Sequence, residues 1–474
     1  MFSDIMSNSW QALFFIIMLL SSISVIPLTS ASVHLEKTPL SPRQQIAYGA
    51  SSENVVCFYG LVLMKKLSDN SPACVKPQTA QKLVERGWGL KISPGNLEPG
   101  TSHVNKTITA TSIMDASNIF MLDYYSAIRE GGDNIFFSPW SILTAFSVAH
   151  EGANGKTADE IASIFHLPPN STQTRTSFQT MQNNLNSNNS GYVLRDTNAL
   201  WIKHDFAIKK EFVDIAKRYY NSEVAQVSFP QDEGKINAWV EQKTNGKIKD
   251  LIHGTDDLTR LVITNAVYFN GTWKTKFEEN STHDADFRVT ASKTVKVLMM
   301  SIDSAFPYAE TDKLQILQMP YKGDRLSMLV LLPKNSDLAS LENSLTTENL
   351  ASWQPKLTSQ EVNVFIPKFQ LETSYDLKEE LSKMGISLAF DPDHADFSKI
   401  SDVQLYIQFA VHDAFVNVNE KGTEAAAATG IGMALTSVYP PPPVFRADHP
   451  FIFMIKDDKT GLVLFMGRVV DPTV

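Results

Sequence analysis

The chain has 474 residues, 43% of them hydrophobic and 20% charged, and a formal net charge of −9. This length and composition predict a globular protein with one large domain and a smaller segment attached to it. Nucleic acids and anionic membranes require a clustered basic face, so the acidic balance and the absence of a block of like charge argue against both as main partners.

Residues 1–31 are predicted to be a secretion signal. The apolar run from Ala12 to Ile26 is shorter than the roughly 20 residues that a membrane span needs, and Thr29-Ser30-Ala31 resembles a small-residue cleavage site. The stretch before the run contains Asp4 and no Lys or Arg, so an uncleaved amino-terminal anchor that tethers the protein to a membrane is the alternative. In both cases the rest of the chain is expected to be exported and extracellular.

Residues 32–92 are predicted to be a small module, followed by a linker over residues 93–111. Both cysteines of the chain, Cys57 and Cys74, lie in this module. In an exported protein such a pair most simply forms a disulfide, with two unpaired thiols as the alternative. The stretch from Ser71 to Gly89 resembles a short extracellular module found on secreted proteins of ammonia-oxidising archaea, which says little about activity.

Residues 112–474 are predicted to form a single large domain of helices and strands. Its first helices are expected at Ile113–Arg129, Pro139–His150 and Lys156–Phe165, and the polar stretch Asn170–Asn189 is a surface helix or loop. Further elements are expected at Tyr192–Ile202, Lys209–Tyr220, Lys235–Thr244, Leu261–Phe269, Leu326–Leu332, Glu361–Phe369, Ser374–Met384, Val411–Val418, Phe451–Ile455 and Leu462–Val469. Because the strands do not alternate regularly with helices, the pattern favours an α+β fold over a doubly wound parallel sheet.

The sequence contains no convincing catalytic constellation. Gly-x-Ser-x-Gly and Cys-x-x-Cys are absent, and His150-Glu151 lacks the second histidine of a helical zinc site. Gly430-Ile431-Gly432 lacks the third glycine and the following helix of a dinucleotide site. We therefore expect no enzyme activity, no cofactor and no metal.

The stretch from Asn419 to Ser437 joins the predicted strand Val411–Val418 to the run Pro440–Pro443. With a period of two, the face that could be buried carries Thr423, Ala425, Ala427, Thr429, Ile431, Met433 and Leu435. Alanine and glycine are poor strand formers, whereas a helix would have to accommodate Gly430 and Gly432 close together. The pattern predicts a segment that can be either loop or strand.

Five motifs in this domain resemble those of the serpins. Phe445–Ile455 matches the family signature, and the stretch after Asn419 is similar to the serpin hinge and reactive loop. The other matches are Asn134–Ile142, Thr264–Trp273 and Val364–Phe369. The resemblance covers essentially Ser112 to Val474, and with the amino-terminal module it suggests a secreted serpin of prokaryotic, archaeal type.

The resemblance implies a metastable fold of three β-sheets and about nine helices with an exposed reactive loop near the carboxyl end. It implies a monomeric suicide substrate that a serine peptidase cleaves, so that the acyl-enzyme is trapped as a covalent complex when the loop inserts into the largest sheet. At about 3.3 Å per residue, roughly sixteen inserted residues carry the cleavage point on the order of 50 Å.

The hinge composition favours an inhibitor. The hinge positions carried over from the family are Glu420, Gly422, Thr423, Glu424, Ala425, Ala426, Ala427 and Ala428. Neither proline nor a large charged residue stands at the inward positions, where it would obstruct insertion into a packed sheet. A non-inhibitory serpin with a carrier, chaperone or storage role is the alternative.

The family's spacing from the hinge acid predicts the cleaved bond between Thr436 and Ser437, with Leu435–Thr436 as the alternative. The residues expected to be recognised by the peptidase are Met433, Ala434, Leu435 and Val438. Because no Lys or Arg lies between Lys421 and Arg446, elastase-, subtilisin- or chymotrypsin-like peptidases are favoured over trypsin-like ones.

Five further residues match the family's sheet-opening region: Ser138, Ser141, Asn265, Trp273 and His412. Buried polar groups of this kind require mutual hydrogen bonds, and their rearrangement could control the opening of the sheet, although plain core packing is the alternative for each residue. Heparin binding is not expected.

The segment that corresponds to the family's usual heparin-binding helix, Asn170–Asn189, carries Arg175 as its only basic residue. This scarcity of positive charge is the reason that heparin binding is not expected.

Overall fold

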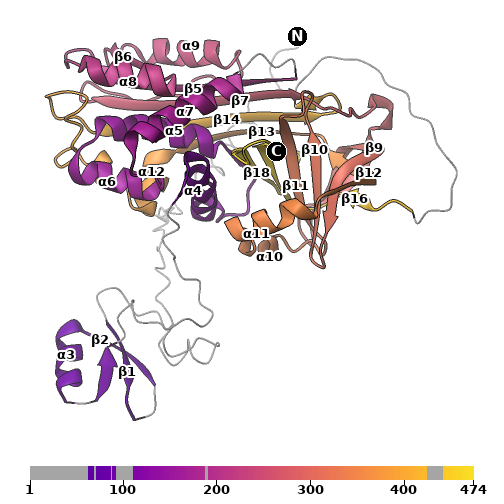
Figure 1. The fold of residues 1–474 in the computed structure, drawn as a ribbon, viewed down its shortest axis with the longest axis horizontal. Helices are drawn as coiled ribbons and strands as arrows, with labels where there is room; N and C mark the ends of the chain where they lie inside the picture. Colours follow the sequence, from indigo (N-terminus) through magenta and orange to yellow (C-terminus); the bar gives the residue numbers. More distant parts are fainter. Residues whose placement is uncertain (1–61, 69–70, 87, 92–109, 187–190, 424–440) are drawn as a thin grey trace, which may run out of the picture. The chain divides into compact units, whose positions relative to one another are not determined.

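The computed structural model describes residues 62–68, 71–86, 88–91, 110–186, 191–423 and 441–474 (Figure 1). The chain divides into two compact units, residues 1–105 and 106–474, which are treated separately below. The predicted signal, residues 1–31, lies outside the described residues. Within the described residues no helix has both the length and the apolar character needed to cross a membrane.

The amino-terminal unit contains a three-stranded antiparallel sheet and one helix. Strand β1 (Val62–Lys66) lies between β2 (Pro72–Val75) and β3 (Gly89–Lys91), and helix α3 (Pro77–Glu85) follows β2. Cys74 lies on β2 opposite Leu63 of β1. Cys57 lies outside the described residues, so its disulfide with Cys74 stays a prediction.

The larger unit contains two sheets. The six-stranded sheet has the order β13 (Phe369–Asp376), β14 (Ile407–Asn419), β15 (Gly422–Thr423), β7 (Leu261–Thr272), β5 (Tyr192–Lys203) and β6 (Glu223–Val227). The nine-stranded sheet has the order β16 (Val444–Arg446), β12 (Thr358–Pro367), β9 (Thr294–Glu310), β10 (Leu314–Pro320), β11 (Leu326–Pro333), β17 (Phe451–Asp457), β18 (Val463–Val469) and β4 (Ile135–Phe137), with β8 (His283–Arg288) paired to β9. With the sheet of the smaller unit, the described residues form three sheets.

Nine α-helices accompany the two sheets in the described part of the larger unit. They are α4 (Ile113–Ile128), α5 (Pro139–Gly152), α6 (Gly155–Ile164), α7 (Ser171–Asn186), α8 (Lys210–Tyr220), α9 (Glu233–Lys243), α10 (Leu338–Asn343), α11 (Thr347–Trp353) and α12 (Leu377–Met384). Short 3-10 turns lie at Glu279–Ser281, Gln354–Lys356 and Leu388–Phe390. The α+β class is confirmed, and the polar stretch that could have been helix or loop forms α7.

The six-stranded sheet is covered on both faces (Figure 1). Residues of α9 such as Ile236 and Val240 pack on an outer face that includes Trp201 and Ala266. The inner face joins the main core, in which α5 lies directly beneath β5, β7 and β18. Alternate residues of a strand point to opposite faces, so successive positions of β5 and β7 point in turn to the side of α9 and to the side of α5.

Helix α5 is buried along almost its whole length, as its apolar sequence predicts. Its start is determined locally, because the Ser138 side chain caps the helix by accepting a hydrogen bond from the Ser141 amide, and Pro139 occupies the first turn, where no backbone N–H partner is needed. The same serine therefore both begins the helix and lies beneath the six-stranded sheet.

Candidate functional site

The central feature of the six-stranded sheet is the seam between β14 and β7. The two strands pair in parallel from Ile407–Leu261 to Phe415–Tyr268. Beyond that point β15 lies between them and pairs antiparallel with both, Thr423 opposite Val418 and Gly271, and Gly422 opposite Asn419 and Thr272. The chain that leaves β14 thus turns back and occupies the space between the ends of its two neighbours.

Gly422 is required for this close approach. Its φ is +147°, and a Cβ built on it would lie 2.0 Å from the backbone oxygen of Gly271. Only glycine adopts such a conformation against neighbouring backbone without strain. The next side chain, Thr423, is fully buried and shares a hydrogen bond of 2.8 Å with the Tyr321 hydroxyl. The predicted hinge residues Gly422 and Thr423 are therefore the two residues of β15.

Glu420 secures the chain just before β15. Its carboxylate accepts a hydrogen bond of 2.8 Å from the Thr282 hydroxyl and lies 3.0 Å from the Lys368 ammonium. Burial opposes ionisation of this group, but backbone hydrogen bonding and the hydrogen bonds from Lys368 and Thr282 outweigh it and lower the pKa of Glu420. The residue is therefore ionised and paired at neutral pH.

Trp273 lies at the same end of the seam. Its Nε1 donates to the Asn419 carbonyl at 3.0 Å, and its ring stacks on Tyr321 with centroids 4.5 Å apart. The backbone amide of Trp273 also donates to the Lys421 carbonyl at 3.1 Å. Trp273 therefore contacts the residues that lead into β15, and its role in the opening of the sheet stays a prediction.

Farther down the inner face, the four other predicted residues form one hydrogen-bonded cluster. His412 on β14 bonds through Nδ1 to the Asn265 side-chain oxygen on β7, and its Nε2 accepts from the Ser138 amide at 3.1 Å. The Asn265 amide donates to the Ser141 hydroxyl, and the Ser138 hydroxyl donates to the Leu464 carbonyl at 2.7 Å. Burial lowers the pKa of His412 to about 3, so the imidazole is neutral and its Nδ1 carries the proton.

Two members of this cluster were not predicted from the sequence. Asn198 of β5 accepts from the Asn265 amide, and Asp196, two residues earlier, accepts from Ser141 and Asn198. The only sequence signal was that both are polar at inward positions of a strand whose other inward residues, such as Leu194 and Leu200, are apolar. The cluster therefore links α5, β5, β7 and β14.

The remaining predicted loop residues lie outside the described part of the chain. These are Glu424, Ala425, Ala426, Ala427, Ala428, Met433, Ala434, Leu435, Thr436, Ser437 and Val438. The position of the cleaved bond stays a prediction.

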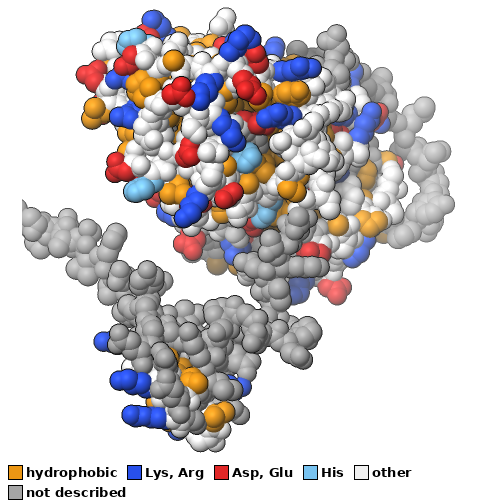
Figure 2. Space-filling view, turned by 60° about the vertical axis from the view of Figure 1, so that its left-hand side comes forward, with side chains coloured by type: hydrophobic (Ala, Val, Ile, Leu, Met, Phe, Trp, Pro, Cys, Tyr) orange, Lys and Arg blue, Asp and Glu red, His pale blue; other side chains and the backbone are white. Residues whose placement is uncertain are grey.

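The charged side chains on the surface are relevant to the prediction that heparin does not bind. Arg175 of α7 forms a bidentate ion pair with Glu151 of α5, with a shortest distance of 2.6 Å. Figure 2 shows Lys and Arg side chains interspersed with Asp and Glu on the face that it presents. This charge arrangement leaves the prediction of no heparin site in place but does not test it.

The fold and this seam define a class of protein: an α+β domain in which the segment after β14 places a two-residue strand between the ends of β14 and β7. Comparison with known proteins gives the family. Residues 115–472 match the family model described as Serpin (serine protease inhibitor). The chain therefore belongs to the serpin family.

Similar proteins occur in archaea and in animals. An uncharacterized serpin-like protein of Thermococcus kodakarensis is 41% identical over 76% of this chain and 86% of that relative. Human leukocyte elastase inhibitor is 37% identical over 76% of this chain and 99% of that relative. The crystal structure of human thyroxine-binding globulin complexed with thyroxine superposes with a TM-score of 0.70 at 29% identity, over 76% of this chain and 98% of the other.

A second structural neighbour, uncleaved ovalbumin, superposes with a TM-score of 0.69 at 30% identity, over 76% of this chain and 100% of the other. The proteins similar to this chain thus include one named as an elastase inhibitor and one named as a thyroxine-binding globulin.

Proposed function

We propose that this protein is an irreversible suicide-substrate inhibitor of serine peptidases. A peptidase cleaves the loop that follows β15, forms an acyl-enzyme with it, and is trapped when the loop inserts between β14 and β7. The observation that carries the proposal is that β15 already pairs with both strands. Insertion then requires the extension of an existing ladder and no new register.

The register of β15 determines which rows the inserted residues join. Continuing the antiparallel pairing places Ala426 between Phe415 and Tyr268, and Thr429 between His412 and Asn265. The members of each of these pairs face each other across the closed seam. The inserted strand therefore enters every row without shifting β14 along β7.

The side chains of the loop suit the two faces that they would meet. Thr423 points to the inner face, so Ala425, Ala427 and Thr429 share that face by the period of two. Their small volume allows insertion above the buried helix α5. Insertion must break the hydrogen bond between His412 and Asn265, and the Thr429 hydroxyl would lie between these two groups as a replacement partner.

The proposed targets are elastase-, subtilisin- or chymotrypsin-like peptidases, cleaving between Thr436 and Ser437 or between Leu435 and Thr436. The absence of Lys and Arg between Lys421 and Arg446 supports this class over trypsin-like peptidases. We further propose that the protein acts outside the cell as a monomer, either released after removal of residues 1–31 or tethered by them.

The test is incubation of the purified protein with pancreatic elastase, subtilisin and trypsin. We expect an SDS-resistant covalent complex with elastase or subtilisin, and mass spectrometry of the released carboxyl-terminal peptide should place the cut at Ser437 or Thr436. The matched control is Thr429→Arg, which leaves the predicted bond intact but puts a charged side chain in the row of His412 and Asn265.

That variant should be cleaved at a similar rate without forming the complex. Clean cleavage of the unaltered protein by all three peptidases, with no complex, contradicts the proposal and favours the non-inhibitory alternative of a carrier, chaperone or storage protein.

A further inference from the structure

Asp196 is a partly buried residue whose carboxylate lies at the end of the polar cluster, on the side away from His412. It belongs to β5, and on the same face of the sheet its Oδ1 accepts hydrogen bonds from the Ser141 hydroxyl at 2.5 Å and the Asn198 amide at 2.9 Å. Its Oδ2 is inaccessible to solvent and has no hydrogen-bond partner among the described residues. A buried oxygen without a partner is costly and calls for a physical explanation.

The side-chain hydrogen bonds that link His412, Asn265, Ser141 and Asn198 run toward this carboxylate. His412 donates to Asn265, Asn265 donates to Ser141 and Asn198, and these two donate to Asp196. Because an ionised carboxylate can only accept, it determines the direction of the Ser141 hydroxyl and the orientation of the Asn198 amide. Asp196 thereby orients the partners of Asn265, the residue on β7 that holds His412 across the seam.

We propose that Asp196 is a positioning residue for strand insertion, one that orients the cluster joining β7 to β14 and makes the closed seam less stable when its carboxylate is charged. The inference rests on the proposed inhibitory function, since it concerns the step in which the seam opens. It assigns a role to a side chain that makes no contact with the seam itself.

The pKa of Asp196 determines whether the seam opens faster at high or at low pH. Burial raises the pKa of Asp196 to about 6, and the hydrogen bonds from Ser141 and Asn198 only partly oppose this effect. The charged carboxylate therefore destabilises the closed native sheet above pH 6, and this destabilisation disappears as the pH falls toward the ordinary value of 3.8. If the cluster loosens as the seam opens, opening is faster at high pH.

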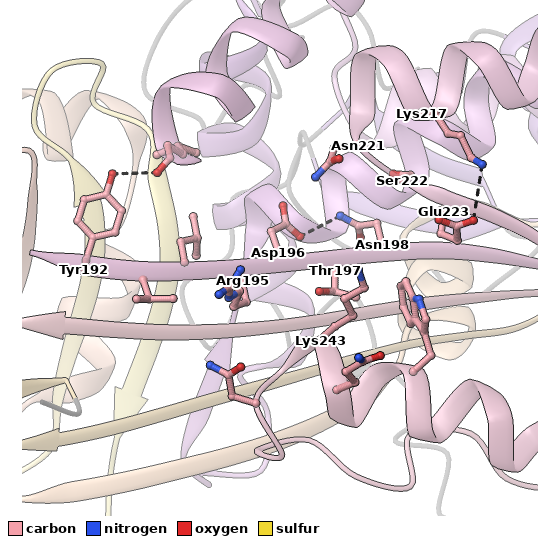
Figure 3. Close-up of a pocket in the computed structure, with 16 residues that line it drawn as sticks. Tyr192, Arg195, Asp196, Thr197, Asn198, Lys217, Asn221, Ser222, Glu223 and Lys243 are labelled. Carbon is pink, nitrogen blue, oxygen red and sulfur yellow. Dashed lines mark hydrogen bonds and ion pairs between the residues drawn. The ribbon is translucent and has the colours of Figure 1, made fainter. Parts of the chain in front are cut away.

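The charged groups near Asp196 line a cavity beside β5. An open cavity of about 990 Å³ lies beside β5, and Figure 3 shows Asp196 on the side of the strand that faces Asn221 and Ser222. The charged residues lining the cavity are Lys217 and Glu223, paired at 3.7 Å, and Arg195 and Lys243. Lys243 lies on the other side of β5 (Figure 3).

No charged group is among the causes of the shift in Asp196, and Ser141 contributes no charge from α5. Across the seam, His412 stays neutral above pH 5 because its pKa is lowered to about 3. We therefore expect the pH dependence of opening to follow the ionisation of the Asp196 carboxyl. One other carboxyl of similar pKa is a competing source of such a dependence.

That competitor, Asp413, provides a matched control. It lies on β14 next to His412 but on the opposite face of the sheet, has one oxygen without a partner among the described residues, and has a pKa raised to about 6, mainly by burial. The groups that face it are Ser374, Glu372 and His253. Asp196→Asn and Asp413→Asn remove carboxylates of similar pKa, and only Asp196 belongs to the cluster.

The experiment measures how fast a labelled synthetic peptide of residues 423–436 anneals to the full-length, loop-intact protein between pH 5 and 7.5. We expect the rate of the unaltered protein to rise about fivefold across this range, the change that corresponds to a pKa of about 6 in the closed sheet and a pKa about one unit lower in the open sheet. Asp196→Asn should anneal slowly at every pH, and Asp413→Asn should keep the rise.

A flat profile for the unaltered protein, or a rise that survives in Asp196→Asn, overturns the proposal. Thermal unfolding is the second measurement, because it requires no annealing. The midpoint of Asp196→Asn should exceed that of the unaltered protein by more at pH 7.5 than at pH 5, and an equal difference at both pH values contradicts the assignment.

Failure of the inhibitory function gives a different result. In that case no variant anneals the peptide at any pH, and cleavage of the loop by elastase does not raise the unfolding temperature. The difference in thermal unfolding midpoint between Asp196→Asn and the unaltered protein would still depend on pH. The proposed role of Asp196 in opening the sheet would then be wrong together with the proposed function.

Discussion

The two sides of β7 are built differently. On one side β5 pairs antiparallel with β7 along nearly its whole length, from Tyr192–Gly271 to Ile202–Leu261. On the other side β14 pairs in parallel, the pairing ends at Phe415–Tyr268, and β15 separates the strand ends beyond it. Parallel pairing is slightly weaker per residue than antiparallel pairing. In the proposed mechanism the sheet opens between β7 and β14, the less extensively paired side, and stays closed between β7 and β5.

The polar cluster distinguishes the same two sides. Between β7 and β5, Asn265 bonds to Asn198, and the backbone ladder of these strands would survive the loss of that contact. Across the seam, the bond between Asn265 and His412 is the side-chain hydrogen bond that joins β7 to β14 within the cluster. One side chain of β7 thus contacts both neighbouring strands.

The largest effect is expected from Asn265→Ala, which removes the common member of both interfaces. His412, Asn198 and Ser141 would each lose a buried partner, and we expect a loss of about 3 kcal/mol in the free energy of unfolding of the loop-intact protein. Urea denaturation measures this loss. The control is Asn270→Ala on the same strand. Its half-buried amide donates to the Tyr268 hydroxyl at 3.0 Å, and the change should cost less than about 1 kcal/mol. Equal losses would mean that the cluster has no special role.

A smaller effect is expected from Gly422→Ala, which disturbs only the end of the seam that β15 occupies. The added Cβ would collide with the Gly271 oxygen, so β15 should detach at a cost of about 2 kcal/mol, and the Thr423 amide should exchange its hydrogen faster. Gly234→Ala in α9 is the control, since a Cβ there meets no atom within 4 Å and alanine favours the helix. Unchanged exchange at Thr423 would show that β15 does not depend on glycine.

The smallest effect is expected from Glu420→Gln, which weakens the anchor in front of β15. The change should cost about 1.5 kcal/mol at pH 7, the usual contribution of hydrogen bonds to a charged group. Because the native pKa of Glu420 is lowered, its charge stabilises the fold above the ordinary value of 4.5, and this contribution is lost as the pH falls. The difference in unfolding temperature between the variant and the unaltered protein should therefore shrink at pH 4.

The matched control for that variant is Glu279→Gln. Glu279 is 70% exposed and pairs with Lys421 at 3.1 Å, so its loss should change the stability by less than about 0.5 kcal/mol. If both variants have the same effect at pH 7, the pairing of Glu420 with Lys368 and Thr282 contributes no more than a surface ion pair.

Sequence patterns located two helices of the large domain closely. A helix was expected at Pro139–His150 and an element of unspecified type at Lys235–Thr244, and α5 and α9 begin and end within two residues of those limits. The strands β8, β9 and β10 were not expected. The 17 residues of β9 mix exposed and buried positions irregularly, because the strand pairs with β8, β10 and β12 along different parts of its length. Such a strand has no simple period of two.

The sequence by itself determined the family, the small side chains of the loop and the acid and glycine at its hinge, because these are properties of contiguous residues. Only the tertiary structure decided how the seam is held. His412 and Asn265 are 147 positions apart, and their bond exists because β14 and β7 are neighbours. Asp196 and Asn198 joined the cluster for the same reason. A polar residue at an inward strand position is visible in the sequence, but its partner is determined by strand order, which depends on packing over the whole domain.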